Sequence, residues 1–377
     1  MPGRATRSRR LLFAALAAGC TALALETVGA PAKSQPSGEG RAGGCTRVWT
    51  IDKRLPRTDL NAVAADARGT WAVGTVDGKG IALRLSGGRW SSTRIAGVRE
   101  LTGVARGTNE IWAVGNRFSG EYSARGIIAR QTGDGWRLLA LHPAPLTTRG
   151  FVLSAVAVRD GDVWIVGSYD NTQGNNGPDD DGWLVARRHA SRWQTWRGGF
   201  SDSLAAVSVV ASDNVWAVGR TGVNIASEDE VAVHWDGSRW SYAMRSRAQD
   251  VRALNDVLAL SRDDVWAVGE PRTEDVPSPA PVVEHWDGRR WTRVALAASL
   301  WPAIPRLTAL AAFRRDDVWA GGDVNGRPAL LHWNGSAWLR ATPPPIAAPL
   351  ADLAAARDGT LWAVGPGFVA HSACRTT

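Results

Sequence analysis

The sequence predicts an all-β protein, a seven-bladed β-propeller of four-stranded antiparallel blades. Three observations support this prediction. A phrase like Val265-Trp266-Ala267-Val268-Gly269 occurs seven times, at intervals of roughly 40 to 53 residues, which is typical of radial β-architectures. A second phrase, like that from His234 to Trp240, alternates with it, and no stretch has the apolar period of a helix. The seven copies centre on Trp71, Trp112, Trp164, Trp216, Trp266, Trp319 and Trp362.

One repeat, from Leu254 to Leu296, serves as the template for the others. Its first strand begins at Leu254, a tight turn follows at 261–264, and the second strand spans 265–269. The third strand spans 282–286, and after an Asp-Gly turn the fourth spans 291–295. Both faces of the second strand are apolar, so both must be covered. Neighbouring blades would cover them, and the repeat tryptophan would lie between blades.

The seventh unit lacks a fourth strand. Its first three strands are expected near 350–355, 361–365 and 368–373, after which the chain ends. We expect residues 47–51, with Trp49 in the place of Trp240, to supply the missing strand. Closing the ring in this way would remove exposed sheet edges.

Two cysteines fall where this closure is expected. Cys45 and Cys374 align with the Asp-Gly turn of the other units, and a disulfide between them would replace the missing covalent turn. An exported protein meets the oxidising conditions that such a bond needs. Two free thiols are the alternative.

The N-terminus has the pattern of an export signal. Several arginines precede the apolar run from Leu11 to Leu25, and Ala30-Pro31-Ala32 is a small-x-small cleavage site. Residues 1–32 are therefore predicted to be removed, residues 33–44 to form a flexible leader, and residues 45–377 to form the propeller. Arg9-Arg10 resembles the twin-arginine signal, and we favour a secreted protein over a lipoprotein anchored at Cys20.

Charge and apolar patterning set limits on the partners. The formal charge of the chain is +8, and it falls to +5 without the signal. No Lys/Arg block points to nucleic acid, and the apolar run of the signal is too short for a comfortable membrane span. We expect no membrane span in the mature chain, and a monomer.

The alternating DVWAVG and HWDGxxW phrases resemble the repeats of secreted bacterial β-propellers, which are distantly similar to the kelch and galactose-oxidase central-domain propellers. The resemblance covers Cys45 to Cys374. It implies the architecture, but proteins with such repeats include enzymes, lectins and scaffolds, so it implies no single function. The paired glycines of kelch blades are mostly missing.

Most of the conspicuous polar residues recur at one repeat position. Four histidines share a position where other units have arginine, so they cannot converge on one metal ion; they are His234, His285, His332 and His371. The pairs Asp263-Asp264 and Asp316-Asp317 likewise recur, and they are interpreted as turn formers. The sequence has no nucleophile elbow and no phosphate-binding glycine loop.

The segments that do not follow the repeat are expected to lie on one rim of the ring. The loops between second and third strands, and those into the next blade, are long and irregular, and ligand sites are often built from such loops. The candidate binding residues there are Tyr169, Asp170, Asn176, Asp179, Asp181, Glu228, Asp229, Glu274, Trp301 and Arg306. Trp301 could be exposed and bind a sugar ring, or it could instead be buried between two blades of the ring. Asp170, Asp179 and Asp181 could hold Ca²⁺, although a solvated acidic loop is the preferred interpretation.

The sequence therefore favours an exported, non-catalytic propeller that recognises a glycan, a cell-wall polymer or an exported protein through this rim. Apart from the possible Ca²⁺, no cofactor is expected. The alternatives are a polysaccharide hydrolase or lyase with its site at the same rim and channel mouth, and a structural scaffold.

Overall fold

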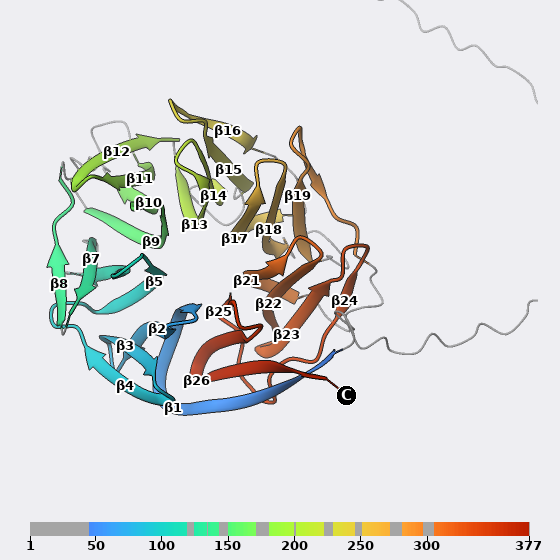
Figure 1. The fold of residues 1–377 in the computed structure, drawn as a ribbon. Helices are drawn as coiled ribbons and strands as arrows, with labels where there is room; N and C mark the ends of the chain where they lie inside the picture. The colour runs from blue at the N-terminus through green and yellow to red at the C-terminus, as the bar shows by residue number, and fades with distance from the viewer. Residues whose placement is uncertain are drawn as a thin grey trace, which may run out of the picture. The chain divides into compact units, whose positions relative to one another are not determined.

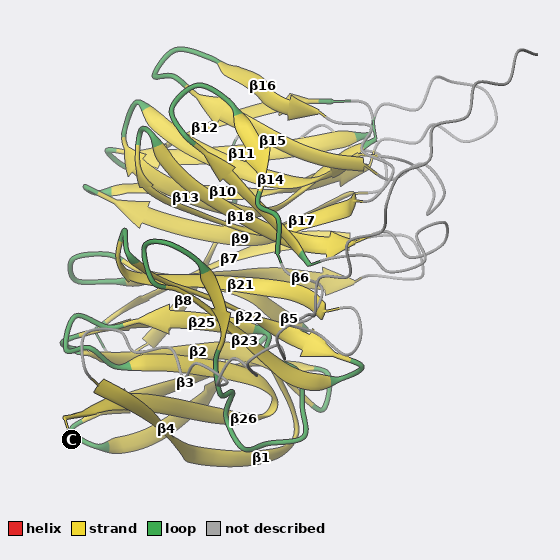
Figure 2. Ribbon diagram, turned by 90° about the vertical axis from the view of Figure 1, so that its right-hand side faces the viewer, coloured by secondary structure: helices red, strands yellow, loops and turns green. Residues whose placement is uncertain are grey.

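The computed structural model describes residues 45–118, 124–133, 135–142, 150–170, 181–199, 201–221, 229–245, 251–271, 281–296 and 305–376. Every regular element in these ranges is a β-strand (Figure 2), which confirms the all-β prediction. The chain divides into two units, residues 1–37 and 38–377. The predicted export signal and leader lie outside the described residues.

The strands follow one another in sets whose consecutive members pair antiparallel. The first set is β1 (Cys45–Asp66), β2 (Gly69–Val76), β3 (Lys79–Ser86) and β4 (Arg89–Arg94). The second is β5 (Glu100–Arg106), β6 (Ile111–Phe118), β7 (Ala124–Thr132) and β8 (Gly135–Leu139). The third is β9 (Gly150–Arg159), β10 (Asp162–Asp170), β11 (Gly182–His189) and β12 (Arg192–Gly198).

The later sets repeat the same order. They are β13 (Asp202–Ala211), β14 (Asn214–Thr221), β15 (Asp229–Trp235) and β16 (Trp240–Arg245); β17 (Val251–Ser261), β18 (Asp264–Pro271), β19 (Val282–Trp286) and β20 (Trp291–Arg293); and β21 (Pro305–Arg314), β22 (Asp317–Val324), β23 (Arg327–Trp333) and β24 (Trp338–Arg340). The chain ends with β25 (Asp352–Ala355) and the long β26 (Leu361–Thr376). Strand β26 also pairs with β1, and a short parallel pairing of β7 with β9 joins the second and third sets.

Within residues 45–376 the sheets stand around a common centre (Figure 1). Strands β5, β9, β13, β17, β21 and β25 are innermost in their sets, and the first set places the C-terminal part of β1 there while the N-terminal part runs along the outer edge. The inner strands contact one another in series, from β1 through β5, β9, β13, β17 and β21 to β25, and β25 contacts β1. The strand order within each set is therefore also an order from the centre outward.

Strand β1 belongs to two ladders. Its C-terminal part pairs with β2, from Thr58 opposite Val76 to Asp66 opposite Gly69. Its N-terminal part pairs antiparallel with β26, and Trp49 lies opposite Ser372. The first and last strands of the described chain therefore lie side by side.

The apolar core lies between neighbouring sheets. Buried side chains form clusters that each join two consecutive sheets, and the repeat tryptophans lie at their centres. All seven repeat tryptophans are at most 6% exposed, and each of the five aromatic contacts that follows joins one of them to the next sheet: Trp71 to Trp136, Trp112 to Trp193, Trp164 to Trp235, Trp216 to Trp286 and Trp266 to Trp333. The predicted position of the repeat tryptophan between sheets is confirmed.

Candidate functional site

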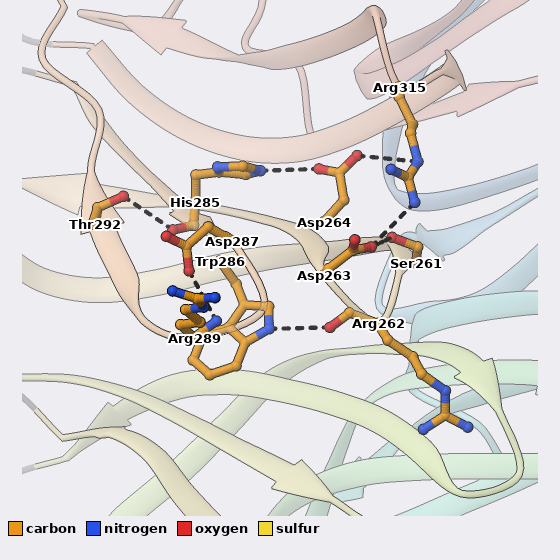
Figure 3. Close-up of polar contacts among 10 residues, drawn as sticks. All are labelled: Ser261, Arg262, Asp263, Asp264, His285, Trp286, Asp287, Arg289, Thr292 and Arg315. Atoms are coloured by element: carbon orange, nitrogen blue, oxygen red, sulfur yellow. Dashed lines mark hydrogen bonds and ion pairs between the residues drawn. The ribbon is translucent and has the colours of Figure 1, made fainter.

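Two of the recurring histidines, His285 and His332, take part in a polar junction between strands, and Figure 3 shows the junction at His285. His285 Nε2 lies 3.0 Å from Asp264 Oδ1, and its ring centroid lies 4.2 Å from that of Trp266. Arg315 of the next sheet lies 3.2 Å from Asp263 and 3.6 Å from Asp264. The arrangement ties two strands and two sheets together.

The same junction recurs one sheet later. His332 Nε2 lies 2.9 Å from Asp317 Oδ1, and Trp319 Nε1 donates to the same oxygen at 2.8 Å. Burial alone would raise the pKa of Asp317, but the hydrogen bonds from His332 and Trp319, with the charges of His332 and Arg47, hold the pKa below its ordinary value. The expected structural role of these histidines fits this geometry.

The interpretation of the paired aspartates as turn formers is corrected for the second member of each pair. Asp264 and Asp317 are buried and begin strands β18 and β22, where they accept hydrogen bonds from the third strand. The first members, Asp263 and Asp316, are exposed. In each pair, therefore, the first aspartate is a solvated turn residue, and the second is buried and hydrogen-bonded to the neighbouring strand.

A belt of hydrogen bonds joins the inner strands. Asn255 Nδ2 donates to the carbonyl oxygen of Leu307 at 2.8 Å, and Thr308 Oγ1 donates to that of Leu350 at 2.7 Å. Asn61 and Thr102 make the same bond to Leu101 and Leu153. The side chain that follows the buried leucine thus links each of these inner strands to the next.

Two carboxylates belong to this belt. Asp256 Oδ2 accepts from the backbone N–H of Leu310 at 2.6 Å, and Asp352 Oδ2 accepts from that of Val63 at 2.7 Å. Burial among the inner strands raises the pKa of Asp256 to about 7. Burial and then the charge of Asp256 raise the pKa of Asp352 well above its ordinary value. Both groups are tied to backbone donors of the next inner strand.

Four of the five described members of the predicted binding set lie at strand ends on one rim. Asp170 ends β10 and Asp181 immediately precedes β11; these two strands pair, with Tyr169 opposite Gly182. Asp229 begins β15 opposite Thr221, the last residue of β14. Arg306 pairs with Asp323 near the end of β22, and its Nε lies 3.5 Å from Glu270 Oε2. Antiparallel order places all these ends on the same side of their sheets.

The remaining members are separated from this group. Tyr169 is 6% exposed and packs in the core beneath the rim, with the guanidinium of Arg197 5.2 Å from its ring centroid. Asn176, Asp179, Glu228, Glu274 and Trp301 lie outside the described residues. No group of three His, Cys, Asp or Glu side chains within the described ranges could hold a metal ion, and the proposed Ca²⁺ set includes Asp179, which is outside them.

One anchored aromatic side chain, whose hydroxyl reaches the rim end of β13, is missing from the predicted set. Tyr242 of β16 is 41% exposed, yet its hydroxyl donates to Asp202 Oδ2 at 2.5 Å and accepts from Trp183 Nε1 at 3.2 Å. The Asp202 side chain is wholly buried, and Arg245 lies 3.4 Å from it. The guanidinium of Arg245 lies 5.3 Å from the Tyr242 ring centroid.

The environment of Tyr242 fixes its protonation as well as its position. Burial of the hydroxyl and the hydrogen bond to Asp202 raise the pKa of Tyr242 to about 12. The phenol therefore stays neutral at physiological pH, and the side chain offers a rigid aromatic ring beside a cation. Such a group suits binding better than proton abstraction.

Comparison with known proteins identifies the architecture. No protein-family model and no curated protein sequence matches the chain. The solved structure of streptogramin B lyase aligns with a TM-score of 0.61 and 11% identity, over 89% of this chain and 100% of that one. YCF48 bound to D1 peptide aligns with a TM-score of 0.58 and 16% identity, over 89% and 96%. The WD40 β-propeller domain of Doa1 gives 0.58 and 10%, over 86% and 97%.

The fold is a β-propeller. At these identities the likeness concerns the fold alone. The more specific resemblance to kelch and galactose-oxidase propellers remains a prediction.

Aligning the repeats with one another could have identified Asp256, Asp352 and Tyr242, which the sequence interpretation missed. The third residue of the inner-strand phrase is alanine or glycine in five units, but aspartate at Asp256 and Asp352. Tyr242 lies two residues after a repeat tryptophan, where the other units have no tyrosine. Departures from the repeat within the strands were therefore as informative as the irregular loops.

Proposed function

We propose that the chain is an exported, non-catalytic binding protein, a seven-bladed propeller whose ring is closed by its N-terminal strand. Six consecutive sets of four strands, followed by β25, β26 and the N-terminal part of β1, support this count. The antiparallel pairing of β1 with β26 supports the closure. The described ranges contain no helix able to cross a bilayer.

The observation that carries the binding function is the anchored Tyr242 at the rim. Its ring is exposed while its hydroxyl is held by a buried carboxylate, so little conformational entropy would be lost on contact with a ligand. Exposed tyrosine beside arginine is a combination that interfaces favour. Asp202 is preceded by Ser201, whose N–H donates to the carbonyl oxygen of Asp181 at 3.1 Å, so the backbone connects the anchor of Tyr242 to a member of the predicted rim set.

The proposed ligand is a glycan, a cell-wall polymer or an exported protein. An aromatic ring can stack on the apolar face of a sugar or pack against a protein side chain, and Arg245 and the rim carboxylates can bind polar groups at its edge. Among proteins of this fold, YCF48 has been seen bound to D1 peptide. The monomeric state belongs to the same proposal, and the acidic loop with Asp170, Asp179 and Asp181 is proposed as a solvated loop, with Ca²⁺ binding as the alternative.

The test is a binding screen with the purified full-length protein. Soluble polysaccharides, an insoluble cell-wall fraction and proteins of the culture medium are presented to the wild type, to Tyr242→Ala and to the matched control Leu138→Ala. Leu138 is exposed on β8, outside the proposed site. We expect Tyr242→Ala to weaken binding about tenfold or more, as loss of an anchored aromatic commonly does, and Leu138→Ala to leave it unchanged.

Equal binding by the wild type and Tyr242→Ala would exclude this site. The same screen also tests the enzymatic alternative, since the streptogramin B lyase structure has a similar fold. Reproducible release of sugar or of unsaturated lyase products would contradict a non-catalytic role.

A further inference from the structure

A pocket of about 660 Å³ lies between β26 with the N-terminal part of β1 and the β3–β4 hairpin. We call it the junction pocket. Its volume is in the usual range of small-molecule sites. Its lining residues come from both sides of the junction and are Asp52, Lys53, Leu85, Gly88, Arg89, Trp90, Thr360, Trp362 and His371.

At the pocket, two repeat positions differ from those of the units that carry a second tryptophan and a buried aspartate. At two other junctions the repeat tryptophan contacts a tryptophan at the end of the neighbouring third strand, as Trp266 contacts Trp333 at 5.1 Å and Trp216 contacts Trp286 at 5.1 Å. The corresponding residue beside Trp362 is the smaller Leu85. The space that an indole fills elsewhere is therefore left open.

The second difference concerns the buried acid. Asp264 and Asp317 bind the histidines of their own sheets, but the corresponding residue before Trp362 is Thr360. His371 therefore uses its Nδ1, which lies 2.6 Å from Asp52 Oδ2. His332, the repeat histidine of β23, is buried, whereas His371, the repeat histidine at this pocket, is 30% exposed.

A β-bulge turns two consecutive charged residues toward the pocket. The β1–β26 register passes from Ile51 opposite Ala370 to Lys53 opposite Val369, so Asp52 is the extra residue. In a regular strand the two side chains would point to opposite faces. The bulge instead lets both Asp52 and Lys53 line the pocket, and bulges often re-aim side chains at functional sites.

The pocket carries excess positive charge. Asp52 is engaged by His371, whereas Lys53 and Arg89 form no ion pair within the described residues. Both cations are exposed. Trp90, at the pocket wall, packs edge-on against Trp362 with 5.9 Å between ring centroids. An apolar wall therefore stands beside two cations for which the described part of the chain supplies no ion-pair partner.

We propose that the junction pocket binds an anionic sugar unit, with its carboxylate or phosphate between Lys53 and Arg89. Both cations can donate charge-assisted hydrogen bonds to such a group. The indole of Trp90 offers an apolar surface for the ring face, and His371 and Thr360 offer polar atoms for hydroxyl groups. This site lies on the rim of short turns, opposite the Tyr242 rim, and is independent of the function proposed above.

Isothermal titration calorimetry with the purified full-length protein tests the proposal. The probes are digalacturonate, glucose 1-phosphate, neutral maltose and an acidic hexapeptide. We expect one or both anionic sugars to bind, with an affinity that falls as salt is raised, and maltose to bind more weakly. Carboxylate-only binding identifies a uronic acid, and phosphate-only binding identifies a sugar phosphate.

Three variants distinguish binding in the pocket from non-specific attraction to surface charge. Lys53→Gln with Arg89→Gln is expected to lower the affinity about tenfold or more. Arg94→Gln with Arg137→Gln removes the same charge from exposed positions outside the pocket and should leave binding unchanged. Leu85→Trp keeps every charge but fills the space, so it should abolish binding. Near-ultraviolet circular dichroism checks the fold of each variant.

The proposal fails if neither anionic sugar binds, if the acidic peptide binds in their place, or if binding survives both the double glutamine variant and Leu85→Trp. If Leu85→Trp does not fold, the double glutamine variant, altered only at exposed positions, still decides. Tyr242→Ala should leave this binding intact, so failure here is distinguishable from failure of the rim site.

Discussion

The glycine that ends each VWAVG-like phrase lies against a carbonyl oxygen of the inner strand. A Cβ atom placed on Gly269 would lie 2.0 Å from the carbonyl oxygen of Ala253, far inside van der Waals contact. The same approach, at 1.9 to 2.2 Å, occurs at Gly74, Gly115, Gly167, Gly219, Gly322 and Gly365. Each glycine lies beside the inner-strand residue that precedes the buried leucine, so the close approach is part of the repeat.

Gly269→Ala is therefore expected to destabilise the fold. The methyl group would displace backbone rather than a flexible side chain, and we expect the free energy of unfolding to fall by roughly 2 to 4 kcal/mol. Urea unfolding measures this. The control is Gly135→Ala, where a Cβ would meet nothing within 4 Å. A loss at Gly269 no larger than at Gly135 would contradict the explanation.

Sequence reasoning recognised this glycine but not its cause. The period identifies Gly269 as part of the regular scaffold, while the carbonyl that it faces becomes visible only when two strands are paired. The same limit explains Asp264. Asp263 and Asp264 are the same residue type in adjacent positions. Only the start of strand β18 at Asp264 shows that Asp264 is buried and Asp263 is a solvated turn residue.

Among the strands, the inner ones were the hardest to predict from the sequence. The predicted third strand of the template matches β19, Val282–Trp286, and the predicted second strand lies within β18. Strand β17, however, begins at Val251 and contains register shifts, one of them between Leu254 and Asp256. Alternation of side chains predicts regular strands well, but it does not predict where an extra residue enters the ladder.

The belt carboxylates give the inner strands a pH dependence. The folded state holds a proton on Asp256 up to a pKa of about 7, whereas the unfolded chain releases it near 4. Stability from this group is therefore complete below pH 4 and is lost as the pH rises toward 7. We expect the wild type to be more stable at pH 5 than at pH 8, by on the order of 2 kcal/mol.

Asp256→Asn tests the assignment, because the amide cannot ionise. The difference in unfolding free energy between pH 5 and pH 8 should shrink in this variant. Asp316→Asn, at an exposed turn position, should keep the full pH difference of the wild type. An unchanged pH profile in Asp256→Asn would show that another group causes the dependence.

At the scale of the whole molecule, a propeller needs every sheet covered on both faces. The sequence predicted this arrangement well because the apolar residues on both faces of the repeat strand require two neighbours. The functional sites were harder to predict. The rim loops depart from the repeat conspicuously, but Leu85 and Thr360 differ from their counterparts by single substitutions, and their effect depends on which sheets meet. Only the pairing of β1 with β26 brings Asp52 to His371.

Closure by the two ends of the chain leads to the last prediction. Cys45 and Cys374 were expected at a turn, but they lie within the β1–β26 ladder, with Cys45 opposite Thr376 and Cys374 opposite Arg47. Their side chains are outside the described part. Diagonal neighbours in such a ladder are about 7–8 Å apart, slightly more than a disulfide spans, so bond formation needs a small adjustment of the strand ends.

We expect the two cysteines to be joined in the exported protein. The intact mass should rise by about 2 Da on reduction, and the bond, which closes a loop of about 330 residues, should contribute on the order of 5 kcal/mol or less to stability. The melting temperature should therefore fall with reductant in the wild type and stay constant in a Cys45→Ala and Cys374→Ala double variant. Equal masses with and without reductant would mean free thiols, and β1 would then be held in the ring by its ladder with β26 alone.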